Sequence, residues 1–114
     1  MLLAEDDPVA QSTTAKLLKN IGVQADVVGN GLEAIHMLQE RSYDVIFMDV
    51  QMPQMDGLQA ARAIRDLWPH RRIRIIALTA CTRKGDRETC LEAGMDGCIA
   101  KPARKEEIAA SLRI

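Results

Sequence analysis

Acidic side chains follow two short apolar runs of the sequence. Glu5 and Asp6 come directly after the run Leu2–Ala4, and Asp49 comes directly after the run Val45–Met48. Carboxylates that lie close together repel one another, and a hard divalent cation with oxygen ligands relieves that repulsion. A single acid at the end of a strand is usually a solvated turn residue. Acids at two such ends together favour a site for Mg²⁺.

A hydroxyl and an ammonium group occupy the same place after two further apolar runs. Thr79 follows the run Ile73–Leu78, and Lys101 follows the run Cys98–Ala100. Ligands of an open parallel sheet bind outside the carboxyl ends of its strands, so groups at these ends converge if the runs are neighbouring strands. Chemically distinct groups at four strand ends are poorly explained as unrelated turns, and we interpret them as one site.

The elements that must position this site can be predicted from short apolar runs that alternate with amphipathic segments. The runs are typical of strands buried on both faces. Asp7-Pro8 and Asn30 are typical of helix starts, and Gly22 and Gly94 of helix ends. The predicted strands are Leu2–Ala4, Ala25–Val28, Val45–Met48, Ile73–Leu78 and Cys98–Ala100, and the predicted helices are Pro8–Ile21, Gly31–Glu40, Gly57–Leu67, Thr82–Ala93 and Lys105–Leu112.

Five such strand–helix units predict an α/β fold in which helices cover both faces of a parallel sheet. Right-handed crossovers leave few topologies, and we expect a flavodoxin-like, doubly wound, five-stranded sheet of order 2-1-3-4-5 with five helices. The length of 114 residues suits a single domain over residues 1–114. The first predicted strand starts almost at residue 1 and the last helix runs almost to residue 114, so we expect a module of a longer protein.

The composition excludes several classes of function. A net charge of −1 removes the electrostatic argument for nucleic acid or a membrane surface as the main partner. The apolar runs are too short to span a bilayer, and no signal peptide is visible. The three cysteines form no Cys-x-x-Cys pair, which indicates reduced thiols and a cytoplasmic location. Arg71, Arg72 and Arg74 form a local basic cluster that we interpret as a solvated loop.

Together these residues identify a resemblance. Glu5-Asp6, the string Met48-Asp49-Val50-Gln51-Met52-Pro53-Gln54-Met55-Asp56-Gly57, Leu78-Thr79-Ala80 and Lys101-Pro102 resemble the response-regulator receiver domain of two-component signalling. The resemblance covers nearly the whole chain, in register with every predicted strand. The ten-residue string is highly specific, and its wording is most like the receiver modules of hybrid sensor histidine kinases.

The resemblance implies that Asp49 accepts a phosphoryl group from a phosphohistidine on a partner. Glu5 or Asp6, Asp49 and the backbone carbonyl of Gln51 would then bind Mg²⁺. The phosphoryl oxygens would be bound by Lys101, by the Thr79 hydroxyl and by the backbone N–H of Ala80. The movement of Thr79 toward the phosphoryl group is the implied trigger of the switch.

Further residues of the motif follow from the same resemblance. Lys101-Pro102 is expected to be a cis peptide bond that aims the lysine. Gln51 stands where aspartyl-phosphate hydrolases carry a second acid, and an amide cannot exchange the proton that rapid turnover needs. Gln51 is therefore expected to tune the lifetime of the phosphoryl group, and so is Cys81, which lies two residues after Thr79 in the sequence.

One position departs from the family pattern. Receiver domains usually carry Tyr or Phe three residues before the lysine, whereas this chain has Cys98. A cysteine fills far less volume than an aromatic ring and lacks its two alternative positions. The phosphoryl chemistry should survive, whereas the usual threonine–aromatic readout is in question. A reactive role for Cys98 competes with the simpler interpretation as a small strand residue.

Two other classes of function compete with this interpretation. The string Gly29-Asn30-Gly31-Leu32-Glu33-Ala34 matches the G-x-G-x-x-A pattern of dinucleotide-binding enzymes. It follows the second predicted strand, however, and in the receiver pattern Asn30 caps a helix that Gly31 opens. The other alternative is a degenerate receiver that binds its partner without being phosphorylated, for which Cys98 is the one supporting feature.

The implied partners are a sensor histidine kinase or a histidine phosphotransfer domain. The chain would be a receiver module of a hybrid kinase, whose parent chain would be anchored in a membrane, or a stand-alone regulator, and we favour the module. A homodimer through the face formed by residues 82–93, 98–100 and 105–112 is a further expectation. A receiver catalyses its own phosphorylation only in a limited sense, which places it at the edge of the enzyme class.

Overall fold

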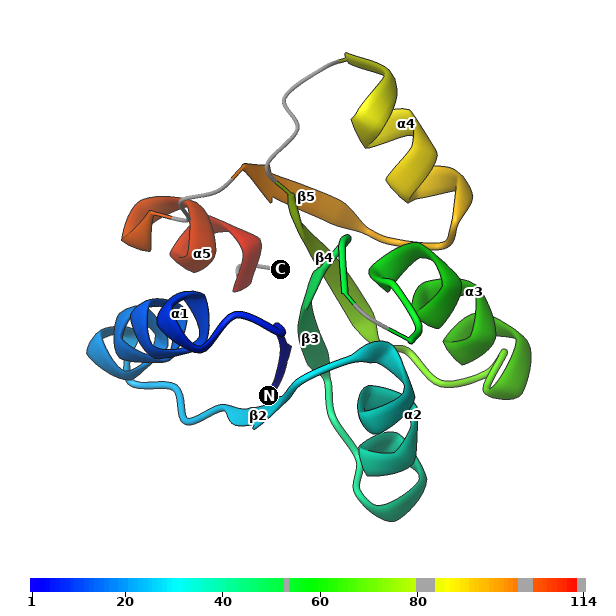
Figure 1. The fold of residues 1–114 in the computed structure, drawn as a ribbon, viewed down its shortest axis with the longest axis horizontal. Helices are drawn as coiled ribbons and strands as arrows, with labels where there is room; N and C mark the ends of the chain where they lie inside the picture. The colour runs from blue at the N-terminus through cyan, green and yellow to red at the C-terminus, as the bar shows by residue number, and fades with distance from the viewer. Residues whose placement is uncertain (53, 80–83, 101–103, 113–114) are drawn as a thin grey trace.

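The computed structural model describes residues 1–52, 54–79, 84–100 and 104–112 (Figure 1). Its elements follow in the order β1 (Leu2–Ala4), α1 (Pro8–Ile21), β2 (Asp26–Val28), α2 (Gly31–Glu40), β3 (Val45–Asp49), α3 (Gly57–Leu67), β4 (Arg74–Thr79), α4 (Lys84–Glu92), β5 (Gly97–Ala100) and α5 (Lys105–Leu112). The strands form one five-stranded sheet of order β2-β1-β3-β4-β5, and every pair is parallel. The predicted fold class and strand order are therefore confirmed.

The sheet separates two hydrophobic cores, because successive side chains of a strand point to opposite faces. Helices α1 and α5 lie on one side of the sheet, and α2, α3 and α4 lie on the other (Figure 1). The α1–α5 core consists of Leu3, Leu18, Phe47, Ile76, Leu78, Ile99 and Ile108. The α2–α4 core is larger and includes Leu2, Ile46, Met48, Ile64, Ile75, Ala77 and Cys90. Each fully buried large side chain stabilises the fold by roughly 1.5–3 kcal/mol.

Polar side chains cap the N-termini of α1, α2 and α3. The Asp7 side chain accepts a hydrogen bond from the Val9 N–H, and the Asn30 side chain accepts one from the Glu33 N–H. Asp56 forms a capping box with Gln59 at the start of α3. Because these bonds satisfy donors that a helix leaves unpaired at its first turn, they fix where each helix begins. The predicted starts at Pro8, Gly31 and Gly57 are confirmed.

The strand boundaries differ from the prediction by one residue where the site begins. Both β3 and β4 extend one residue farther than predicted, since Asp49 pairs in register with Leu78, and Thr79 pairs with Ala100. Asp49 and Thr79 are thus held by the sheet itself and are not the first residues of flexible connections. The predicted helix 82–93 appears as α4 from Lys84 to Glu92, and Thr82 and Arg83 lie outside the described residues.

The basic cluster after α3 is a partial correction. Arg71 is half-buried, and its guanidinium lies 5.0 Å from the centre of the Trp68 ring. It also donates to the carbonyl oxygens of Leu38 at 3.0 Å and of Arg41 at 3.4 Å, at the end of α2. Arginine suits this place because its planar group can stack on an aromatic ring and donate several hydrogen bonds at once. Arg71 therefore connects the loop after α3 to the end of α2, whereas Arg72 is exposed as expected.

Candidate functional site

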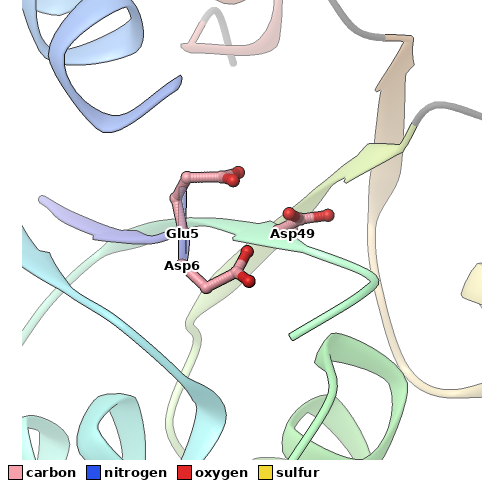
Figure 2. Close-up of side chains that lie close together, drawn as sticks. All are labelled: Glu5, Asp6 and Asp49. Carbon is pink, nitrogen blue, oxygen red and sulfur yellow. The ribbon is translucent and has the colours of Figure 1, made fainter. Parts of the chain in front are cut away.

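The acids of the predicted site come together at the carboxyl edge of the sheet. Glu5 follows β1 and Asp49 ends β3, the neighbouring strand. Glu5, Asp6 and Asp49 each present a ligand oxygen, and these three oxygens lie within 4.8 Å of one another. Figure 2 shows the three carboxylate groups facing a common space. We call Glu5, Asp6 and Asp49 the acid cluster.

Burial makes this cluster unusual among surface acids. Only 1% of Glu5 and 5% of Asp49 are exposed, whereas Asp6 is open to solvent. Placing two carboxylates in a poorly hydrated site next to a third costs free energy, which a bound cation offsets. The open side at Asp6 leaves room for water and an anionic ligand.

The donor set fits Mg²⁺ in its chemistry. Carboxylate oxygens are hard ligands, and Mg²⁺ binds oxygens at about 2.1 Å, so two of its ligands lie at most about 4.2 Å apart. Adjacent ligands of an octahedral ion lie about 3.0 Å apart. The oxygens of the acid cluster lie within 4.8 Å of one another, so they would have to approach one another by up to about 1.8 Å to bind the ion together. After this approach, Glu5, Asp6 and Asp49 could hold the ion, with waters completing its coordination.

Backbone contacts fix the orientation of the Asp49 carboxylate. The N–H of Gln51 donates to Oδ1 of Asp49 at 3.1 Å, and the N–H of Val50 donates to the carbonyl of Leu78 at 3.0 Å. The chain beyond β3 is therefore tied both to β4 and to the Asp49 carboxylate. The Gln51 side chain is exposed, which is where a residue must lie to influence water at the site.

The spacing from Asp49 to Gly57 has a physical reason. The N–H of Gly57 donates to the carbonyl of Val50 at 2.9 Å, which closes the loop between β3 and α3. A Cβ atom at position 57 would collide with the main-chain carbonyl of Asp49. Glycine therefore lets the first turn of α3 pack directly on the residue that carries the carboxylate. The sequence offered this residue within the motif string but did not reveal its contact.

Thr79 lies beside the acids, one strand farther along the sheet. It is the last residue of β4, 7% exposed, and pairs in register with Ala100. Ala100 is the residue that directly precedes Lys101 in the sequence. Lys101, Pro102, Ala80 and Cys81 themselves lie outside the described residues.

Cys98 occupies the atypical position with a half-buried side chain. It pairs with Ala77, and Thr79 lies two residues farther along β4, so Cys98 and Thr79 share one face of the sheet. Cys98 packs against the α2–α4 core. The observed environment is that of a small strand residue that packs against the core.

The glycine pair of the dinucleotide-like string has a different environment from a phosphate site. The N–H of Gly29 donates to the Glu33 carboxylate at 3.1 Å, and the N–H of Glu33 donates to Asn30 Oδ1 at 2.9 Å. A carboxylate and an amide oxygen thus already occupy the start of α2, where a dinucleotide would place its phosphates. The acid would repel such a ligand, so the structure does not favour a dinucleotide-binding enzyme.

A comparison with protein families supports the receiver resemblance. The family model of the response regulator receiver domain matches residues 1–113 of this chain. The chain belongs to the response-regulator receiver family. This receiver is 44% identical to two-component system protein A of Emericella nidulans over 95% of its length, and 36% identical to hybrid signal transduction histidine kinase K of Dictyostelium discoideum over 100%. It spans only 16% and 10% of these relatives, respectively.

Solved structures agree with this assignment. The receiver domain of the sensor histidine kinase PA1611 from Pseudomonas aeruginosa, with a magnesium ion coordinated in its active site cleft, shares 41% identity and a TM-score of 0.86; the match covers 96% of this receiver and 89% of that chain. The receiver domain of Ssk1 in complex with the phosphotransfer protein Ypd1 of Saccharomyces cerevisiae shares 27% identity and a TM-score of 0.88, over 95% and 81% of the two chains. Within the described residues of this receiver, no helix combines the length and apolar character that a membrane span needs.

Proposed function

We propose that this receiver is a phosphoacceptor module of a phosphorelay, which takes a phosphoryl group from a phosphohistidine onto Asp49. The observation that carries the proposal is the acid cluster, whose three oxygens lie within 4.8 Å at the carboxyl edge of the sheet. A receiver that only bound its partner would have no need of two buried acids at this point. The magnesium-bound receiver of PA1611 supports the same assignment.

The reaction needs little from the protein except position and charge. An oxygen of Asp49 attacks phosphorus, the phosphorus–nitrogen bond of the phosphohistidine breaks, and the bonding pair returns to the imidazole, which then takes up a proton. The hydrogen bond from the Gln51 N–H holds the carboxylate in one orientation for that attack. Glu5, Asp6, Asp49 and the Gln51 carbonyl would bind Mg²⁺, which supplies neutralisation of the charge on the transferring group.

Residues at the ends of β4 and β5 would bind the product. The Thr79 hydroxyl and the Ala80 N–H donate to phosphoryl oxygens in this proposal, and Lys101 pairs with another as a point charge. The added charge of about −1.5 to −2 draws Thr79 toward Asp49 and alters the face of α4, β5 and α5. Gln51 adjusts the lifetime of the phosphoryl group, because an amide cannot serve as a general acid and base for rapid hydrolysis. Cys81, two residues after Thr79 in the sequence, adjusts it as a residue next to the site.

The wider setting is also part of the proposal. In this proposal residues 1–114 form a single cytoplasmic receiver domain, and the relative named as a hybrid histidine kinase supports a module of such a kinase. Its partner is the kinase or a histidine phosphotransfer protein, as in the complex of Ypd1 with the Ssk1 receiver. Phosphorylation is proposed to promote a homodimer through α4, β5 and α5, which sedimentation before and after phosphorylation would test.

Incubation with acetyl phosphate and Mg²⁺, followed by intact-mass measurement at short times, tests the phosphoacceptor. We expect one phosphoryl adduct that is absent from Asp49→Asn and from samples with EDTA. Asp44→Asn is a matched control, because Asp44 is an exposed acid at the opposite edge of the sheet, just before β3. If folded wild-type protein gains no adduct, the phosphoacceptor role fails and a phosphorylation-independent binding module replaces it.

A further inference from the structure

The start of α2 contacts the loop between β3 and α3, in which the N–H of Gln51 donates to Asp49 of the acid cluster. The N–H of Gly31, the first residue of the helix, donates to the carbonyl of Met55 at 3.0 Å. The first N–H groups of a helix have no partner within the helix, so they bind whatever acceptor lies in front of them. Here that acceptor is the last carbonyl of the β3–α3 loop before the N-cap residue Asp56.

Gly31 leaves no space between α2 and this loop. A Cβ atom at position 31 would lie 2.7 Å from the Met55 carbonyl oxygen and 2.9 Å from the Ala60 Cβ, where ordinary contacts begin at 3.4 Å. The Met55 neighbour is a backbone carbonyl, and the Ala60 neighbour is a Cβ atom of a buried helical residue, so neither can rotate out of the way. The absence of a side chain at position 31 therefore sets how closely the loop and α3 approach α2.

The same loop carries the main-chain groups of the site. Its first residues are held to the sheet, because Val50 N–H donates to Leu78, and Gly57 N–H donates back to the Val50 carbonyl. Gln51 lies between these ties and Met55, and its N–H holds Oδ1 of Asp49. Because the loop is held at both ends, we expect a displacement of Met55 to shift the stretch that contains Gln51.

We infer that Gly31 is a positioning residue for the metal site, acting through Met55 and the β3–α3 loop on Gln51 and Asp49. The inference rests on the proposed magnesium site and gives a role to the glycine that the dinucleotide-like string left unexplained. Asn30 assists, since its Nδ2 lies 3.5 Å from Oε1 of Gln54 in the same loop. Gly31 contacts no reacting atom. It acts by setting the path of the β3–α3 loop.

The test compares Gly31→Ala with Gly29→Ala. A Cβ atom at Gly29 would meet only the flexible Glu33 carboxylate, at 3.9 Å, so this variant makes the same chemical change without the collision. Moving the Met55 carbonyl to ordinary contact requires about 0.7 Å, and groups that orient metal ligands typically change affinity tenfold or more. By titration calorimetry with Mg²⁺ alone, we expect the Kd of Gly31→Ala to rise roughly tenfold, and that of Gly29→Ala to stay near the wild type.

A second readout separates positioning from loss of folding. Hydrogen exchange of the Gln51 and Gly57 amides without metal should be faster in Gly31→Ala, while amides of β3 and β4 keep their protection. If Gly31→Ala does not fold, Asn30→Ser, which keeps a helix cap but loses the contact with Gln54, should weaken Mg²⁺ binding in the same direction. Mg²⁺ binding by the folded variant that equals the wild type overturns the inference, whereas wild-type protein that binds no Mg²⁺ overturns the proposed function instead.

Discussion

The α-carbon of Gly57 packs against the main-chain carbonyl of Asp49, so the first turn of α3 rests on the residue that ends β3. The N–H of the same glycine donates to Val50. The helix start and the candidate phosphoacceptor are therefore one structural unit, and a change at one of them should be felt at the other.

Gly57→Ala should lower the stability of the receiver and slow its phosphorylation. The added methyl group meets backbone, which cannot rotate away, and overpacking of this kind costs about 1–3 kcal/mol. Gly97→Ala is the control, since a Cβ there would meet only the Ile76 side chain at the ordinary distance of 3.6 Å. Urea unfolding of both variants measures the difference, and equal stabilities would contradict the contact.

Asp49→Asn should have opposite effects with and without metal. In EDTA the variant should be more stable than the wild type by about 1–3 kcal/mol, because one charge of the acid cluster is removed. In Mg²⁺ at a hundred times its Kd, the wild type should gain about 2.7 kcal/mol and the variant much less. Thermal and urea unfolding at low ionic strength check both effects. A gain in Mg²⁺ that is the same for both proteins would place the ion elsewhere.

Tyr43 should make stability fall in alkaline solution. Burial, and then its hydrogen bond to Asp26, raise the pKa of the Tyr43 hydroxyl above its ordinary value of 10.0. Because the folded state holds this proton more tightly, the contribution is complete below pH 10.0 and is lost as the pH rises through the raised pKa. Urea unfolding against pH should show this loss in the wild type and a smaller one in Tyr43→Phe, which at neutral pH is weaker by about 0.5–1.5 kcal/mol.

Asp96 should matter more than the arginine that it pairs with. Oδ2 of Asp96 accepts from Arg65 at 2.8 Å and also from the buried N–H of Ile75 at 2.8 Å. Asp96→Ala leaves that N–H without its acceptor, at a cost of about 1–3 kcal/mol. The ion pair is partly exposed, so Arg65→Ala loses about 1 kcal/mol or less from it. Chemical unfolding ranks the two, and a larger loss in Arg65→Ala would reverse this assignment.

Cys98 should be dispensable for phosphorylation. Its side chain packs against the α2–α4 core. Cys98 pairs with Ala77, whereas Thr79 pairs with Ala100, so Cys98 and Thr79 share a face of the sheet without being paired with each other. Cys98→Ala should therefore accept phosphate from acetyl phosphate at nearly the wild-type rate. Cys98→Tyr restores the usual residue type of the family and should change partner binding more than it changes phosphorylation. A large loss of phosphorylation in Cys98→Ala would give the thiol a role in the chemistry.

The sequence predicted the fold well because its signals are local. Alternating apolar runs, the caps at Asp7 and Asn30 and the helix start at Gly57 depend on neighbouring residues, and the structure agrees with them to within about one residue. The convergence of Glu5, Asp6 and Asp49 was also predictable, since strand order brings known strand ends together.

Contacts between distant segments were not predictable. Nothing in the local pattern shows that Gly31 abuts Met55, or that Arg71 reaches back to the end of α2. A glycine that opens a helix and an arginine in a loop look alike whether they are packed or solvated. These roles depend on the distance between helices, which the side chains of several elements set together.

The register of β3 and β4 has a consequence for how a signal would travel. Asp49 aligns with Leu78 of the α1–α5 core, whereas Thr79, the next residue, belongs to the face of the α2–α4 core. The sheet thus separates the two side chains, with the proposed acceptor Asp49 on one side and the Thr79 hydroxyl, proposed to respond to it, on the other. A group bound to both side chains would connect the two sides of the sheet, whose hydrophobic cores are separate. Each hydrophobic core could then change in evolution to suit a different partner, while the residues at the carboxyl edge of the sheet kept the same chemistry.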